Sequence, residues 1–353
     1  MLPQETFYRD RRVLVTGHTG FKGTWLCWLL SALGAEIYGF ALPPLTECLY
    51  ECARPQAADE CLEDIRSRAG IAQALDRFQP DIIFHLAAHA YLDGSYEYPA
   101  DIFEINVMGT VGLLEEVRRS GRRIPVVVIT SDKCYAQALR GRPCREADPF
   151  GAAEAYSSSK ACQDLAAQCY GISFPSVPVA TARASNTIGG GDFNQNRLVP
   201  HLLDRFAHGR PAQLRNPDFV RPWQYVLDVL WGYLMLGKDL SDGDLKGDTA
   251  FNFGPAPDGF QTVGRVAELL AVQFPGARCE RQAGGCSGET EILRLDSEKA
   301  RQILGWQPQY TLEEALAQTA AFYKKMQEVP AAQLCREQAE QYIERVRSRE
   351  KLS

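Results

Sequence analysis

The sequence has no long apolar run and no excess of positive charge, and both absences exclude classes of function. Of its 353 residues, 38 are Lys or Arg and 44 are Asp or Glu, which gives a formal net charge of −6. A protein that binds nucleic acid through a basic face needs the opposite balance. The longest apolar stretch, residues 25–33, is much shorter than the roughly 18 residues of a membrane span. We therefore expect neither a nucleic-acid partner nor a membrane partner.

Cysteine and histidine are not arranged as a disulfide framework or as metal ligands. The 11 cysteines are an odd number and lie scattered along the chain, which has only 5 histidines. Cys48, Cys52 and Cys61 form one loose group, without the second close pair that a zinc site usually has. We expect reduced thiols, a cytoplasmic protein and no bound metal.

Short apolar strands alternate with helical segments over the first half of the chain. The predicted strands are 12–16, 36–40, 81–88, 125–130 and 176–182, and the predicted helices are 24–33, 71–78, 102–119 and 156–170. Continuously apolar strands are typical of a parallel sheet that is covered by helices on both faces. The pattern predicts an α/β fold, a doubly wound parallel Rossmann sheet over residues 1–186.

The pattern changes after residue 186. Glycine-containing loops now separate single helices, which are predicted at 198–208, 262–274 and 311–326. We interpret residues 187–330 as a smaller C-terminal substrate-binding lobe, whose chain returns in places to the large domain. Residues 331–353 are rich in charge and predict a helical tail that is exposed to solvent.

A glycine triplet, Gly17, Gly20 and Gly23, lies between the first predicted strand and the first predicted helix. A pyrophosphate must approach the backbone closely, so side chains are excluded there, and the helix N-terminus supplies free N–H groups. The triplet predicts a dinucleotide cofactor. The second strand ends without a carboxylate for the ribose and without an arginine for a 2′-phosphate. Residues 64–66 lie where a loop could flank adenine, or they are a helix cap with a surface ion pair. We predict NAD as the cofactor.

A tyrosine and a lysine one helical turn apart follow the predicted strand that ends near Ser131. Tyr156 and Lys160 share one face of a helix. An ammonium beside a phenol lowers the phenol pKa from about 10, so the tyrosine can take a proton from a sugar hydroxyl. The Ser131 hydroxyl would steady the same oxygen. The adjacent Asp132 and Lys133 are either an acid and a base in the reaction or an inert ion pair.

At these residues the sequence resembles the nucleotide-sugar branch of the extended short-chain dehydrogenase/reductase family. The resemblance covers roughly residues 10–326. It is carried by Gly17-His-Thr-Gly-Phe-Lys-Gly23, Thr130-Ser-Asp-Lys-Cys-Tyr135, Ile188-Gly-Gly-Gly-Asp192, Arg197-Leu-Val-Pro200, Arg215-Asn-Pro217, Arg221-Pro-Trp-Gln224 and Leu304-Gly-Trp-Gln-Pro308. Lysine at position 133, where other hexose dehydratases have glutamate, is similar to the branch that acts on CDP-glucose.

The resemblance implies an NAD-dependent 4,6-dehydratase of a nucleotide hexose, and CDP-glucose as its substrate. Tyr156 would deprotonate the C4 hydroxyl while NAD⁺ takes the C4 hydride. Asp132 would protonate the departing C6 hydroxyl, and Lys133 would be the base at C5 or its helper. The hydride would then return to C6 and leave a 4-keto-6-deoxy sugar.

The resemblance also implies binding residues and an assembly. Besides the three glycines, Tyr156 and Lys160, it implies cofactor contacts from Phe21, Asp64, Ile65, Ala87, Ala88 and Asn106. It implies substrate contacts from His89, Asp93, Asn186, Arg197, Arg215 and Arg221. Because guanidinium groups match phosphate oxygens, the last two arginines fit a diphosphate clamp. We expect a homodimer or a higher homo-oligomer.

Three positions depart from the family pattern, and they leave the sugar and its nucleotide base open. Asp93 stands where arginine is usual, Ala155 where proline is usual and Ser185 where glycine is usual. The alternatives are a dehydratase or C4 epimerase acting on another nucleotide sugar, and a dinucleotide sensor without catalysis. An epimerase needs no acid at C6, so Asp132 favours a dehydratase. A sensor needs no proton acceptor beside the nicotinamide, so Tyr156 favours an enzyme.

Overall fold

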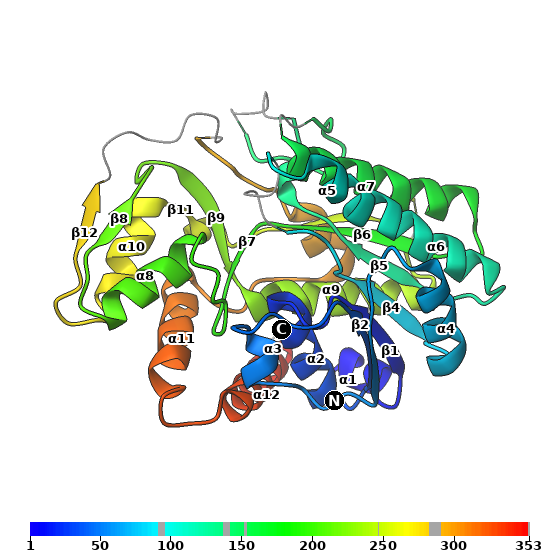
Figure 1. Ribbon diagram of the computed structural model, residues 1–353, viewed down its shortest axis with the longest axis horizontal. Helices are drawn as coiled ribbons and strands as arrows, with labels where there is room; N and C mark the ends of the chain where they lie inside the picture. Colours follow the sequence, from blue (N-terminus) through cyan, green and yellow to red (C-terminus); the bar gives the residue numbers. More distant parts are fainter. Residues whose placement is uncertain (91–95, 137–141, 152–153, 246, 282–290, 352–353) are drawn as a thin grey trace.

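The computed structural model of the chain describes residues 1–90, 96–136, 142–151, 154–245, 247–281 and 291–351. Within them, seven parallel strands form one sheet in the order β10-β6-β5-β4-β1-β2-β3 (Figure 1). The strands are β1 Arg12–Thr16, β2 Glu36–Ala41, β3 Asp59–Leu62, β4 Ile82–His85, β5 Val126–Ile129, β6 Val179–Ala184 and β10 Ala250–Phe253. The prediction of a doubly wound parallel sheet is confirmed, and all five predicted strands are present.

Helices cover both faces of this sheet. On one face lie α4 Arg68–Phe78, α5 Pro99–Phe103, α6 Gly109–Arg119 and α7 Ala155–Ser173, and on the other lie α1 Pro3–Tyr8, α2 Phe21–Ala32, α9 Val226–Asp242 and α12 Ala331–Glu350 (Figure 1). Successive residues of β1 face opposite cores: Val13 and Val15 pack with α2 and α9, and Leu14 packs with α4 and α6. Burial on both sides explains why these strands are continuously apolar.

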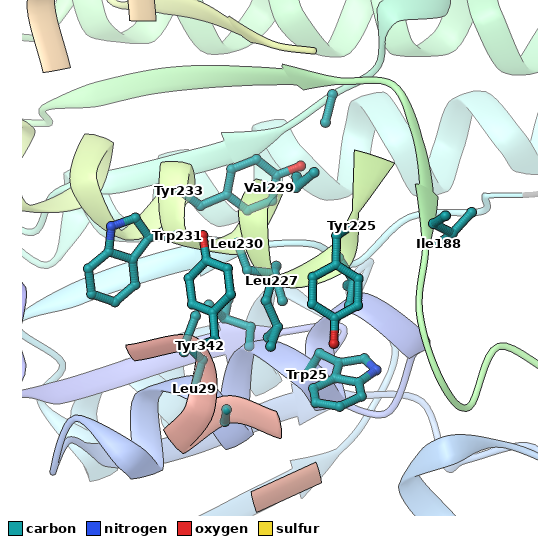
Figure 2. Close-up of a cluster of buried hydrophobic side chains, with 14 of the residues drawn as sticks. Trp25, Leu29, Ile188, Tyr225, Leu227, Val229, Leu230, Trp231, Tyr233 and Tyr342 are labelled. Atoms are coloured by element: carbon teal, nitrogen blue, oxygen red, sulfur yellow. The ribbon is translucent and has the colours of Figure 1, made fainter. Parts of the chain in front are cut away.

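The C-terminal helix α12 is not the solvent-exposed tail that its charge predicted. One of its faces is buried and packs against α2 and α9, as the position of Tyr342 in Figure 2 shows. The Tyr342 ring lies 6.0 Å from the Trp231 ring, and its hydroxyl donates a hydrogen bond of 2.9 Å to Asp228 Oδ1. The charged side chains occupy the opposite face of the helix. The predicted helix is therefore present, but its exposure to solvent was predicted wrongly, because apolar residues at helical spacing lie among the charges.

The smaller lobe stands beside the carboxyl ends of the strands (Figure 1). Its sheets contain β7 Asn186–Ile188, β9 Val220–Tyr225 and β11 Phe260–Thr262, and β8 Ala212–Leu214 with β12 Cys279–Arg281. Its helices are α8 Leu198–Ala207, α10 Val263–Ala271 and α11 Leu312–Lys325. Between these segments the chain returns to the large domain through α9 and β10. The domain boundaries at 186 and 330 stay a prediction.

Short elements complete the described chain: α3 Leu49–Cys52, the π-helical turns η2 Glu104–Met108 and η5 Ala300–Leu304, and the 3-10 turns η3 Asp132–Cys134 and η4 Pro257–Gly259. Over the described residues, we find no helix with the length and apolar character needed to cross a bilayer.

Candidate active site

The three glycines between β1 and α2 serve different purposes. Gly17 has φ +74°, a conformation that side chains disfavour, and a Cβ there would lie 2.7 Å from the Ala87 backbone nitrogen. A Cβ at Gly23 would collide with the carbonyl oxygen of Gly17. A Cβ at Gly20 meets nothing closer than that same oxygen, at 3.4 Å. Packing therefore requires glycine at 17 and 23, whereas Gly20, at the N-cap of α2, leaves the helix N-terminus open. This arrangement fits a dinucleotide pyrophosphate.

The adenine side of the predicted site holds carboxylates that already have partners. Both oxygens of Asp64 accept hydrogen bonds from the Arg66 guanidinium, as close as 2.7 Å, which is the surface ion pair that the sequence left open. Glu60 of β3 lies 3.1 Å from His18 Nε2 and also binds Tyr50 and Arg54. Ile65 is buried.

Ser131 and Asp132 lie directly after β5. The Ser131 hydroxyl donates to Asp132 Oδ1 and accepts from the Lys133 backbone N–H, both at 3.2 Å. Asp132 is buried, and its Oδ2 has no hydrogen-bond partner among the described residues. Burial raises the Asp132 pKa to about 6, against the opposing charges of Lys133, Lys22 and Arg221. The side chain is thus a carboxylic acid that keeps its proton to unusually high pH.

Tyr156 and Lys160 lie in the first turns of α7, whose N-cap Glu154 accepts hydrogen bonds from the Tyr156 and Ser157 backbone. Burial raises the Tyr156 pKa to about 12, although a hydrogen bond with Ser131 opposes the change. Burial lowers the Lys160 pKa to about 7. The expected lowering of the Tyr156 pKa by the lysine is wrong for these side chains alone: burial has the largest effect on Tyr156, and the groups that oppose it are Ser131 and Arg197. Lys133 Nζ lies 5.9 Å from the centre of the Tyr156 ring.

Two arginines of the small lobe face this cluster. Arg197, the N-cap of α8, forms an ion pair of 2.9 Å with Asp192, and its charge acts on Tyr156. Arg221 of β9 lies over the Phe219 ring at 5.2 Å, and its charge acts on Asp132. The predicted catalytic residues and these two predicted substrate residues therefore come together between the lobes.

The other predicted substrate residues are less closely tied to the cluster. Asn186 begins β7 and pairs with Trp223 of β9. Arg215 follows β8 and is exposed. The His89 backbone N–H donates a hydrogen bond of 2.7 Å to Asn106 Oδ1, which holds this loop against η2. Asp93 lies outside the described residues.

The remaining predicted cofactor residues lie around the glycine turn. The Ala87 N–H donates to Thr16 Oγ1 beneath Gly17, and Ala88 follows in the same loop after β4. Phe21 opens α2. Asn106 is buried in η2, and its amide nitrogen donates to the His89 carbonyl and to Ser159 Oγ. Asn106 thus uses its amide to hold the loop after β4 against α7.

Sequence reasoning missed several polar residues at this site. Lys22 lies within the quoted glycine motif, and its charge acts on Asp132 and Lys160. Burial lowers the Lys22 pKa to about 8. Behind the strand end, Asp164 accepts 2.7 Å from Thr130 Oγ1 and forms a buried ion pair of 2.8 Å with Arg183. A motif could have indicated Lys22, because it lies within the glycine motif. No local pattern could have indicated the Asp164–Arg183 ion pair, because its two residues are apart in the sequence.

Comparison with known proteins identifies the family of the chain. Residues 13–254 match the family model described as the NAD dependent epimerase/dehydratase family. The chain belongs to this family of extended short-chain dehydrogenases/reductases, and the predicted family and its cofactor NAD are confirmed.

Individual relatives narrow the class. The chain is 37% identical over 331 residues to CDP-glucose 4,6-dehydratase of Salmonella typhimurium, covering 91% of this chain and 92% of that protein. It is 28% identical to dTDP-glucose 4,6-dehydratase of Xanthomonas campestris, covering 88% and 92%. The structure of UDP-glucose 4-epimerase from Thermus thermophilus in complex with NAD matches with a TM-score of 0.77 and 25% identity, covering 89% and 99%. These similarities support an enzyme related to nucleotide-sugar dehydratases.

Proposed function

We propose that this chain is an NAD-dependent 4,6-dehydratase of a nucleotide hexose and that its substrate is CDP-glucose. The observation that carries the proposal is Asp132, a buried carboxylic acid whose pKa of about 6 suits proton donation near neutral pH. The Asp132-Lys133 pair and the similarity to a CDP-glucose 4,6-dehydratase support the substrate.

The chain's own residues perform the proton transfers. Ser131 and Tyr156 hold the C4 hydroxyl, and Tyr156 accepts its proton. The resulting C4 ketone acidifies the C5 proton, which Lys133 removes or helps to remove. Asp132 protonates the C6 oxygen so that it leaves as water. NAD would supply the hydride exchange between C4 and C6; as the hydride is added at C6 a proton returns to C5, so that the net change is the loss of one water with no net oxidation.

The small lobe binds the nucleotide diphosphate in this proposal. Arg197 and Arg221 belong to the lobe, yet their charges act on Tyr156 and Asp132 of the large domain. Planar guanidinium groups suit phosphate oxygens. Asn186 and Arg215 supply further contacts, and the Gly20 turn with Lys160 holds the cofactor. The homo-oligomeric state and the cytoplasmic location stay predictions.

A panel of nucleotide sugars tests the proposal. The enzyme is incubated with NAD⁺ and with CDP-, UDP-, GDP- or dTDP-glucose, and mass spectrometry follows the loss of one water. CDP-glucose should react fastest, and Tyr156→Phe should lose roughly 10²–10⁴ of the rate. Faster turnover of another nucleotide sugar would contradict the choice of cytosine as the nucleotide base, but not the dehydratase activity. An epimerised sugar without water loss would instead indicate a C4 epimerase.

A further inference from the structure

The Lys160 ammonium has two hydrogen-bond acceptors inside the protein. Lys160 is only 4% exposed, and its Nζ donates 2.7 Å to Gln163 Oε1 and 3.2 Å to the Ile129 carbonyl. An ammonium has three protons. These two acceptors therefore fix the direction of the third proton. Gln163 is the only one of the two acceptors that a side-chain substitution can remove.

The orientation of the Gln163 amide is itself determined by buried neighbours. Thr110 Oγ1 lies 2.7 Å from the Asn106 carbonyl, which can only accept, so the single Thr110 proton is used there. Thr110 must then accept from Gln163 Nε2, which lies 2.8 Å away. A flipped amide would place its oxygen against a hydroxyl without a free proton and its NH₂ against the ammonium. Gln163 Oε1 must therefore face Lys160.

The same reasoning extends to the glycine turn. His85 Nε2 lies 2.8 Å from Thr110 Oγ1 and must donate to it, since the Thr110 proton is already used. His85 is fully buried, and burial lowers its pKa to about 3, so the ring is neutral and its Nδ1 accepts from Thr16 Oγ1 at 2.7 Å. Thr16 in turn accepts from the Ala87 N–H beneath Gly17. One chain of hydrogen bonds with a fixed polarity thus joins the glycine turn to Lys160.

We propose that Gln163 is a positioning residue that aims the Lys160 ammonium into the active site, held in its orientation by Thr110 and His85. This inference rests on the proposed role of Lys160 in the reaction. Gln163 is fully buried and acts through the lysine.

Gln163 is also a neutral acceptor among charged neighbours. The titratable groups that face Lys160 are Lys22 of α2, Asp164 of α7, Cys134 of η3 and His85 of β4. The Lys22 charge disfavours a second cation, and Asp164 favours it. An amide oxygen stabilises the charged lysine less than a carboxylate does. The charge at position 163 should therefore set the pH at which Lys160 loses its proton.

Two substitutions move this pH in opposite directions. Gln163→Glu puts an anion beside the ammonium and should shift the high-pH limb of kcat/KM upward by roughly 1–3 pH units. Gln163→Met removes the acceptor at similar volume and should shift that limb downward by about one unit. The matched control is Gln168→Met on the same helix. Gln168 donates a hydrogen bond to Asp164 and not to Lys160, so the high-pH limb of kcat/KM should not move in this variant.

The outcomes separate this inference from the proposed function. Thermal unfolding of each variant measures any loss of fold. A lower kcat with an unmoved pH limb in both Gln163 variants would mean a purely structural role and would overturn the inference. Lys160→Met provides the other arm: if it keeps full activity, the proposed function fails. If Lys160→Met is inactive while both Gln163 variants keep the wild-type profile, only the positioning role fails.

Discussion

Replacing Asp132 with asparagine should separate the two halves of the reaction. Oxidation at C4 needs Tyr156, Lys160 and NAD⁺, but loss of water needs an acid at the C6 oxygen, because hydroxide is a poor leaving group. Asparagine keeps the shape of the side chain and can still accept a hydrogen bond from Ser131, but its amide is not an acid and cannot protonate the C6 oxygen. The variant should therefore remove the hydride from C4 and then stall.

The size of the effect follows from the Asp132 pKa. With a pKa of about 6, about one carboxyl in ten is protonated at pH 7. At the ordinary value of 3.8 the fraction would be below about one in a thousand, so burial supplies about 100-fold more acid. Loss of a positioned acid typically costs roughly 10²–10⁴ in rate, and we expect the dehydration step of Asp132→Asn to fall by that factor.

Single-turnover absorbance measures both steps. The variant mixed with NAD⁺ and CDP-glucose should show an NADH signal that rises and persists, whereas the wild type should show at most a transient. Dehydration at the normal rate would exclude Asp132 as the acid. Absence of any NADH, with sugar binding intact by calorimetry, would refute the division of labour between Tyr156 and Asp132.

Three further predictions follow from packing and burial. Gly20→Val should weaken NAD binding without unfolding the protein, which calorimetric titration with NAD measures. Gly23→Ala, whose Cβ meets the Gly17 carbonyl, should instead lower the free energy of unfolding by about 1–3 kcal/mol, which thermal melts measure. Burial raises the pKa of Asp228 from 3.8 to about 7, so its contribution to stability is present at low pH and is lost as pH rises through 7. Between about pH 4 and pH 7 the Asp228→Asn variant should lose less stability than the wild type, and equal slopes in chemical denaturation would contradict this. The side chains of Leu165 and Ile172 are 54% and 80% exposed on one face of α7. Changing both residues to Glu should convert the predicted homodimer to a monomer in analytical sedimentation. A wild-type protein that sediments as a monomer would refute the predicted assembly.

The sequence predicted the elements whose pattern is local and missed those that depend on distant partners. The buried strands and the turn at Gly20 could be predicted because each corresponds to a short, continuous stretch of sequence with a recognisable pattern. Strand β3, Asp59–Leu62, was missed because it lies at the sheet edge and is largely polar. Helix α9 was missed because nearly all of its residues from Val226 to Leu240 are buried, so its sequence lacks the alternation of apolar and polar faces that marks a surface helix. In the site, Ser131, Asp132 and Tyr156 carry motif spacing. Gln163 does not, because its role depends on Thr110, which is 53 residues away.

The packing of α12 on α2 has a consequence for how the protein folds. Helix α2 and helix α12, which covers part of its apolar surface, are far apart in the sequence. Contacts between such distant segments close late and slow the folding of a domain. Without α12, α2 loses part of its cover, including Arg336, which lies over the Trp28 ring at 5.9 Å. A chain that ends at Pro330 should therefore bind a hydrophobic dye and hold NAD poorly. The glycine turn lies at the start of α2, so its stability depends on a helix that is far from it in the sequence.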